Sequence, residues 1–177
     1  MSTLYVDTIN EKTSGNGIEI PGHVLQVAQT IKTDTFTTTS TSMVDITGLS
    51  VNITPKSSSS KILVMYDVTC TGSHYVSYID VLRDSTVLAQ PDAAGSRPIN
   101  TSVQTIRNEL VATHGGTDRH NGTILDSPAT TSQITYKVQT KARSTHTTYV
   151  NRGEPDRNTA EYDGRQTSTI TVMEIGG

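Results

Sequence analysis

Threonine and serine dominate this chain, together filling 49 of its 177 positions. Threonine is β-branched, so it loses side-chain freedom in a helix but fits well on the half-solvated surface of a β-sheet. Disordered chains are also polar, yet they usually combine high net charge with few β-branched apolar residues. This chain has a formal net charge of −3, and valine and isoleucine recur at alternating positions. The pattern predicts a folded, all-β protein.

Runs of alternating apolar and polar residues, spaced about ten residues apart, predict an antiparallel β-sandwich or jelly roll over residues 23–177. The most apolar run, Lys61–Val68, is expected to be a central strand buried on both faces. The closing run is expected to be central as well. The expected strands are Val24–Ile31, Thr33–Thr39, Leu49–Ile53, Lys61–Val68, Val76–Leu82, Thr86–Leu88, Ile134–Thr140, Thr148–Arg152 and Ser168–Ile175. Val103–Ala112 fits a strand or a short helix, and the all-β context favours a strand.

The first 22 residues differ from the rest of the chain. Leu4–Ile9 and Gly17–Ile20 read as two short strands, and Asn16-Gly17 between them is a tight-turn signal. Two such strands bury too little surface to be stable alone. We therefore expect residues 1–22 to form an anchor or stalk segment that packs on other chains. Its expected interface residues are Leu4, Val6, Ile9, Ile18 and Ile20.

Composition argues against several classes of partner. The sequence contains no apolar run long enough to cross a membrane and no N-terminal signal-peptide pattern. Its 8 arginines and 6 lysines are scattered singly and the isoelectric point is about 5.9, which argues against a nucleic-acid-binding face. The single cysteine, Cys70, rules out an intrachain disulfide framework, and we expect it to be a buried small hydrophobe.

The candidate chemistry is sparse. His114 and His120 lie six residues apart in a glycine-rich segment, whereas metal sites favour closer histidine pairs, so we expect a solvated loop there. No Gly-x-Ser-x-Gly elbow or phosphate-binding glycine loop occurs. The carboxylates of the 152–165 segment read as a solvated face rather than as the rigid acid pair of a glycosidase. We expect no enzymatic activity and no catalytic, cofactor-binding or metal-binding residue.

Three long, polar segments are the expected places of outward recognition, because binding residues concentrate on loops held by a rigid scaffold. They are 90–100, 114–122 and 141–165, each punctuated by glycine or proline. A second interpretation stays open, in which these loops cover sheet edges and contact neighbouring proteins. The candidate recognition residues are His114, Asp118, Arg119, His120, Arg152 and Asp156.

Several stretches, in order along nearly the whole chain, resemble virion appendage proteins of marine tailed phages, cyanophages included. The resemblance implies a fibre or spike component with a β-sandwich head on an N-terminal attachment segment, usually as a trimer, and it supplies no catalytic residues. The chain has no long shaft, unlike a host-reaching tail fibre. The stretches are Leu4–Ile9, Gly15–Val24, Lys32–Phe36, Asp45–Leu49, Ser59–Val64, Leu82–Thr86, Leu125–Ser132, Thr135–Gln139 and Ser168–Ile175.

The sequence thus predicts a phage virion structural protein, made in the host bacterial cytoplasm. It would be a short homotrimeric fibre or spike on the tail, collar or capsid, joined to other virion proteins by its N-terminus. Its head would attach to the host or environment, with a host surface glycan as candidate ligand. We expect no cofactor, nucleic acid or membrane insertion. The alternative is a carbohydrate-binding or depolymerising module, although aromatic residues make up 5% of the chain and tryptophan is absent.

Overall fold

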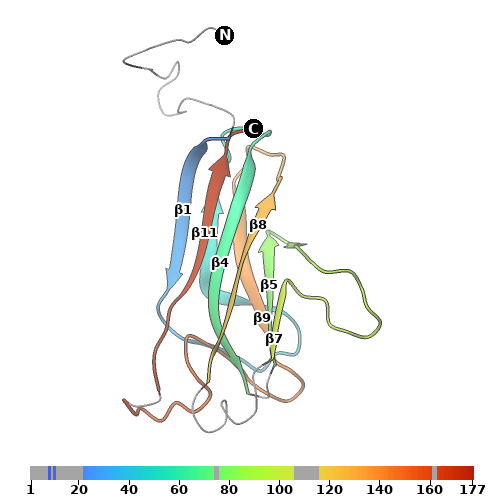
Figure 1. Ribbon diagram of the computed structural model, residues 1–177, viewed down its shortest axis with the longest axis vertical. Coiled ribbons are helices and arrows are strands. Elements are labelled where there is room, and N and C mark those ends of the chain that lie inside the picture. Colours follow the sequence, from blue (N-terminus) through green and yellow to red (C-terminus); the bar gives the residue numbers. More distant parts are fainter. Residues whose placement is uncertain (1–7, 9, 11–21, 74–75, 106–115, 161–162) are drawn as a thin grey trace, which may run out of the picture.

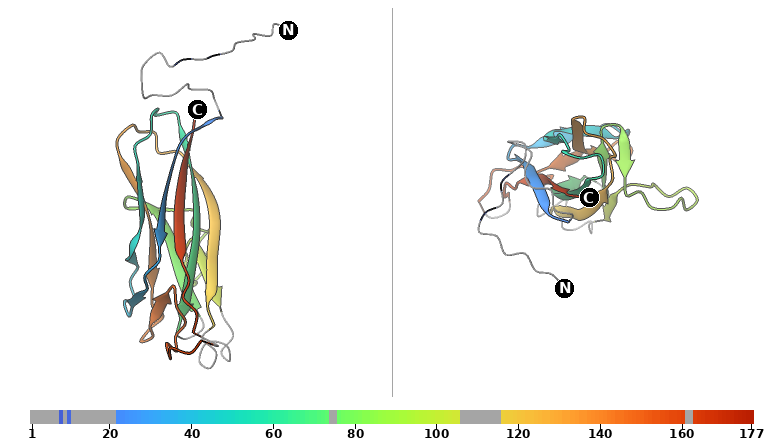
Figure 2. Two further views of the ribbon diagram at one scale, coloured as in Figure 1. Left: turned by 90° about the vertical axis from the view of Figure 1, so that its left-hand side faces the viewer. Right: turned by 90° about the horizontal axis from the view of Figure 1, so that it is seen from above.

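The computed structural model describes residues 8, 10, 22–73, 76–105, 116–160 and 163–177, which form two antiparallel sheets packed face to face (Figures 1 and 2). The all-β prediction is confirmed, and no helix that could cross a membrane occurs among these residues. The strands are β1 (Val24–Lys32), β2 (Phe36–Thr38), β3 (Val44–Ile53), β4 (Lys61–Gly72), β5 (Val76–Arg83), β6 (Thr86–Leu88), β7 (Ser102–Thr105), β8 (Asp118–Asp126), β9 (Ile134–Lys141), β10 (Thr148–Val150) and β11 (Ser168–Ile175).

Sheet A is centred on β4, which pairs with other strands along both of its edges. One edge carries β8. The other edge carries β11 opposite residues 61–67 and then β10 opposite 70–72. Outside these two strands lie β1, paired with β11, and β2, paired with β10. The closing strand β11 is therefore central, as the sequence predicts.

Sheet B has the order β3–β9–β5, and two short strands share the remaining edge of β5. β6 pairs with β5 at residues 81–83, and β7 pairs with it at 76–79. The expected strand 103–112 is confirmed up to Thr105, and the rest of that range lies outside the described residues.

Between the sheets lies a core of alternating apolar side chains, which accounts for the periodicity of the sequence. Ile62, Val64 and Val68 of β4 face the core and are fully buried. The expectation that 61–68 is buried on both faces is wrong, because Leu63, Met65 and Asp67 point outward and are only partly covered. Cys70 is fully buried, as predicted, and burial raises the pKa of its thiol to about 12.

Asn151 links the strands that lie on one side of β4, namely β10 and β11 next to it and β1 and β2 outside them. It has a φ of 62°, a left-handed conformation that asparagine tolerates, so the chain turns away after β10. Its Nδ2 donates to the carbonyl oxygens of Lys32 (3.0 Å) and Asp34 (2.8 Å), where β1 gives way to β2. Its Oδ1 accepts a hydrogen bond from the Ser168 hydroxyl at 2.6 Å, where β11 begins. Residues 152–167 therefore leave and re-enter the sheet at one fixed point.

The two ends of the sandwich are formed by different parts of the chain, and we call them the terminal end and the distal end (Figure 2). At the terminal end, the Gly22 amide donates to the Gly176 carbonyl at 2.7 Å, so the start and finish of the sandwich lie side by side. At the distal end lie residues 142–147 and 152–167 and the start of β8 (Figure 1). The expected anchor residues Leu4, Val6, Ile9, Ile18 and Ile20 lie outside the described residues.

One buried and one partly buried carboxylate stabilise the terminal end. Both oxygens of Asp126 in β8 accept from the Arg83 guanidinium of β5 at 2.8 Å, and the Tyr136 hydroxyl of β9 donates to one of them at 2.7 Å. Glu174 in β11 is fully buried and accepts from the Lys56 amide (2.7 Å) and from the Gln26 side chain (2.5 Å). Charge-assisted bonds of this kind are stronger than neutral ones, so they tie the two sheets and the nearby loop together.

Candidate functional site at the distal end

The predicted recognition residues fall into three groups. Arg119 and Asp118 begin β8 at the distal end, and Arg152 and Asp156 lie in the neighbouring 152–167 segment. His120 lies in the interior. His114 lies outside the described residues.

The prediction of an exposed loop over 114–122 is wrong from Asp118 onward, because these residues belong to β8. His120 is fully buried, and its ring lies between the Ser77 hydroxyl of β5 (2.7 Å) and the Ser102 hydroxyl of β7 (2.8 Å). Burial lowers its pKa to about 4, so the imidazole is neutral at pH 7. His120 is therefore a link between the two sheets and is not available for recognition.

Asn121-Gly122 looks like turn chemistry but lies within β8. Gly122 pairs with Tyr66 of β4, and a Cβ on Gly122 would come within 2.6 Å of the Tyr66 hydroxyl oxygen. The glycine therefore serves close packing of an aromatic ring against the strand rather than a reversal of the chain. This explains why a segment with loop-like composition is a strand.

Arg119 precedes the inward-facing His120 in β8, so its side chain points outward. Its side chain is 57% exposed, and its Nε lies 3.1 Å from Asp67 Oδ1 on the adjacent β4. Asp118 is partly buried, and this burial raises the pKa of its carboxyl. The start of β8 thus presents one exposed guanidinium at the distal end of sheet A.

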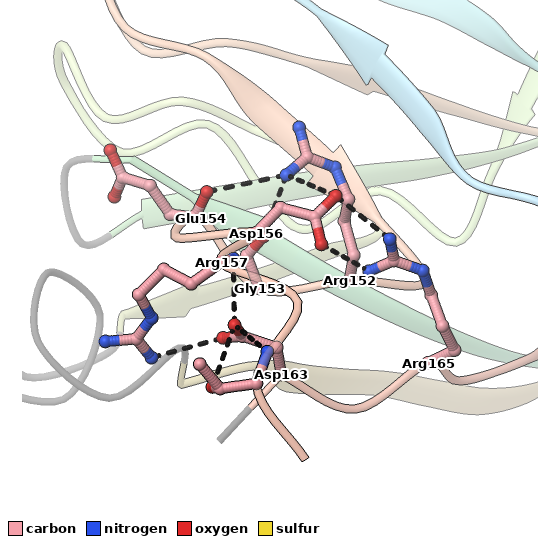
Figure 3. A network of polar contacts seen from close by, with 8 residues as sticks. Arg152, Gly153, Glu154, Asp156, Arg157, Asp163 and Arg165 are labelled. Carbon is pink, nitrogen blue, oxygen red and sulfur yellow. Dashed lines mark hydrogen bonds and ion pairs between the residues drawn. The ribbon is translucent and has the colours of Figure 1, made fainter. Parts of the chain in front are cut away.

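An ion-pair network organises the 152–167 segment (Figure 3). Arg152 stacks on the Tyr149 ring of β10, 4.1 Å from its centroid, and donates to the carbonyl oxygens of Gly153 and Glu154. Asp156 lies 2.8 Å from Arg165 and 3.7 Å from Arg152, and the Arg165 hydrogen bond lowers its pKa. Arg152 and Asp156, predicted from loop composition alone, are therefore neighbours that shape the loop.

Asp163 closes a second turn of this segment. It accepts hydrogen bonds from the Arg157 side chain (3.1 Å), the Arg157 amide (2.8 Å) and the Thr159 amide (3.2 Å). These donors, led by the Arg157 side chain, hold the pKa of Asp163 at about 2. The carboxylate is thus charged at every pH at which the protein is expected to work.

A polar hollow of about 440 Å³ opens beside this segment, lined by Thr69, Thr117, Arg119, Gln166 and Thr167. Gln166 Nε2 donates to the Thr117 hydroxyl at 3.0 Å, which fixes the amide. Gln166 Oε1 and the Thr69 hydroxyl are buried and have no hydrogen-bond partner among the described residues. Buried polar atoms are normally paired, so these two are sites where a ligand or water hydroxyl would gain hydrogen bonds. Of the residues that line this hollow, only Arg119 was predicted from the sequence to be a recognition residue.

A second hollow, of about 490 Å³, lies on the outside of sheet B around an irregularity in β3. Its carboxylates are already engaged, since Asp45 accepts from Lys137 (2.9 Å) and Gln139 (2.7 Å) and Asp84 accepts from the Thr135 amide (3.0 Å). Nothing in the local sequence pattern indicated this hollow.

The third predicted recognition loop, 90–100, stands apart from the other two. It projects sideways from sheet B (Figure 1), and its return is tied down by Asp80, which accepts from the Asn100 amide (3.1 Å) and the Thr101 backbone (2.9 Å). The structure therefore gathers 116–119 and 152–167 at the distal end and leaves 90–100 on the flank.

The donor set of the distal hollow suits hydrogen bonding to a polar ligand. Hydroxyl groups, one amide and one guanidinium line it, and Arg119 is its single ionisable residue. Across the residues that the structure describes, no three His, Cys, Asp or Glu side chains converge as metal ligands would. No protein-family model matches the chain, and no curated protein does. The candidate site accordingly rests on its own geometry.

Proposed function

We propose that this protein is a structural component of a tailed-phage virion, a short homotrimeric fibre or spike on the tail, collar or capsid. Residues 1–22 would anchor it to other virion proteins, and the sandwich would be presented for attachment to the host or the environment. The sequence resemblance to phage appendage proteins supports the class. The separation of the two ends of the sandwich supports the assignment of anchoring to one end and of attachment to the other.

The observation that carries the proposal is this separation. The chain enters the sandwich at Gly22 at the terminal end, whereas the 152–167 segment and the distal hollow lie at the opposite end (Figure 2). β4 runs between the two ends with 12 residues. At ~3.3 Å per residue that strand is about 40 Å long. An anchor at residues 1–22 would leave the distal loops facing away from the virion.

The strand order supports a jelly roll. Taking β1/β2, β6/β7 and β10/β11 as single segmented strands, sheet A contains the first, last, third and sixth strands in order, and sheet B the second, seventh, fourth and fifth. This interleaving of chain halves is what two Greek keys folded together produce. Such sandwiches recur in viral capsid proteins, which agrees with the proposal at the level of fold only.

Deletion of residues 1–22 tests the anchor. We expect the remaining head to keep its β-sheet circular dichroism and cooperative unfolding but to be lost from purified virions. A matched control replaces Arg97 on the flank with alanine, which should not affect incorporation. A truncated head that incorporates at the normal level would overturn the proposal.

A carbohydrate-binding role of the head is the second candidate, and the distal hollow favours it over depolymerisation. Its unpartnered Thr69 hydroxyl and Gln166 carbonyl, next to the Arg119 guanidinium, match the alternating donors and acceptors of a sugar. The double variant Arg119→Ala/Gln166→Ala should lower adsorption to host cells, whereas Arg97→Ala on the flanking loop should not. Unchanged adsorption of the double variant would exclude the hollow as the recognition site.

A further inference from the structure

The outer face of sheet A is unexpectedly apolar. Of the six exposed large hydrophobic side chains among the described residues, four lie on its two edge strands: Val24, Val27, Ile31 and Leu125. Val27, Ile31 and Leu125 are each more than half exposed, at 55–56%. In a chain that is 33% hydrophobic overall, apolar side chains collected on a solvent-facing sheet need an explanation.

Strand register arranges these side chains in rows. Val27 on β1 pairs with Met173 on β11, Met173 with Leu63 on β4, and Leu63 with Leu125 on β8, so one apolar row crosses all four strands. The next row toward the distal end is more polar, with Met65 beside Thr171 and Thr123 and with Gln29 donating to Thr171 at 2.7 Å. The row after it contains Ile31, with Asp67 in the same row. We call this surface the apolar face and define it by Val27, Ile31, Leu63, Met65, Leu125 and Met173.

Charged groups border the apolar face without entering its centre. Lys61 lies at the terminal end of β4, and the Asp67–Arg119 ion pair lies toward the distal end. An apolar centre with a polar rim is the usual anatomy of a protein interface. Arg119 of this ion pair also lines the distal hollow, so the hollow adjoins the distal edge of the apolar face.

The outer face of sheet B has the opposite character. Lys137 donates to Asp45 at 2.9 Å, Gln139 donates to the same carboxylate at 2.7 Å, and Thr135 donates to Asn52 at 2.8 Å. These cross-strand polar pairs are what a solvated sheet face normally displays. Sheet A also carries one such pair, because Gln29 donates to Thr171 at 2.7 Å, but the apolar row that crosses its four strands has no counterpart among these pairs of sheet B.

We propose that the apolar face is the surface through which copies of this chain associate, an inference that rests on the homo-oligomer in the proposed function and specifies its interface. Around the threefold axis of the proposed trimer this surface would meet its own copies, which requires that like charges do not oppose each other, and the uncharged centre of the face meets that condition. Four strands spaced by ~4.8 Å and about eight residues long give a flat footprint of roughly 500 Å². This footprint is smaller than the ~800 Å² per partner of a standard interface, so the apolar face would form the centre of the contact and its polar rim the rest.

Charge substitutions on the full chain test this assignment. Val27→Glu and Leu125→Glu each place a charge on an exposed position, so the sandwich itself should fold. We expect light scattering to show the wild type as an oligomer of the 19.1 kDa chain and each variant as a monomer, with the association constant weakened about a hundredfold or more. The matched control, Ser50→Glu on the exposed outer face of sheet B, should remain oligomeric.

The outcomes separate the two proposals. A wild-type oligomer that both glutamate variants leave intact would overturn the interface while sparing the homo-oligomer. A wild type that is monomeric at micromolar concentration would overturn both the interface and the homo-oligomer. In that case another part of the chain or a different virion protein would cover the apolar face. The milder variants Val27→Thr and Leu125→Thr, checked by circular dichroism, guard against misfolding and should weaken association by a smaller factor.

Discussion

The terminal and distal ends of this sandwich use the same residue types in opposite ways. At the terminal end, the fully buried carboxylate of Glu174 and the partly buried carboxylate of Asp126 connect a strand to a loop and strands of different sheets. At the distal end, the carboxylates of Asp156 and Asp163 bond within one segment, mainly to arginines that are partly exposed. Buried charged pairs are costly to break, whereas exposed pairs contribute little to stability.

This difference indicates where the molecule tolerates change. The terminal end, where the chain enters the sandwich at Gly22, is fastened by bonds between elements that only the complete fold brings together. The distal 152–167 segment is fastened mostly to itself and is attached to the sheets at Asn151. Substitutions in that segment should therefore alter local shape without unfolding the sandwich.

The largest expected effect follows removal of the Asp126 carboxylate. Asp126→Ala leaves the Arg83 guanidinium and the Tyr136 hydroxyl without their shared acceptor, so we expect the free energy of unfolding to fall by about 4 kcal/mol. Urea denaturation measures the loss. The matched variant Asp156→Ala at the distal end should unfold at nearly the wild-type urea concentration. Equal losses in the two variants would remove the contrast between the ends.

Acid should act on the interior through His120. Its pKa is about 4 in the folded state and about 6.5 when unfolded, so the unfolded chain binds the extra proton first. Stability is thus fully present above pH 6.5 and falls as the pH drops toward 4, by up to about 3 kcal/mol at 1.36 kcal/mol per pKa unit. His120→Gln should lower stability at neutral pH but flatten this profile between pH 6.5 and 4. An unchanged slope in the variant would assign the acid response to other groups.

Much of the fold was predictable because alternation of apolar residues is a local signal. β3, β4 and β9 carry buried apolar residues at alternate positions over much of their length, and β11 does so at Ile170 and Val172. These strands were expected from the sequence, although β3 was expected only over Leu49–Ile53. β8 was missed, because its inward positions include His120 and Gly122 rather than a run of apolar residues.

The partners that explain the missed features are distant in sequence. His120 is satisfied by Ser77 and Ser102, which are 43 and 18 residues away. Gln166 meets Thr117 across 49 residues to form the wall of the distal hollow. Local composition identified Arg119, Arg152 and Asp156 as surface residues of long loops or their margins, but only the fold shows that Arg119 borders a hollow while Arg152 and Asp156 hold a loop in shape.

A smaller loss is expected when Glu174 becomes glutamine. Glutamine keeps one acceptor for the Lys56 amide, but its new amide group faces the Gln26 side-chain donor, so one hydrogen bond is lost. We expect the free energy of unfolding to fall by about 2 kcal/mol. Adding Gln26→Ala to this variant should lower the free energy of unfolding little further, because the two amide donors then no longer face each other. Fully additive losses would show that Glu174 and Gln26 do not interact.

The smallest effect on stability is expected at Asp163. Asp163→Asn removes the ion pair with Arg157 and weakens the hydrogen bonds from Thr159, all of which lie within one segment. Because this segment joins the sandwich through Asn151 and not through Asp163, the urea midpoint should not change measurably. Limited proteolysis should instead cut residues 152–167 faster in the variant than in the wild type. The pKa near 2 adds a pH test: the wild-type loop should stay protected from an acid-active protease down to about pH 3, and lose protection only as the carboxylate is protonated. A variant with wild-type cleavage but reduced urea stability would show that this loop is part of the cooperative fold, and the contrast between the two ends would then fail.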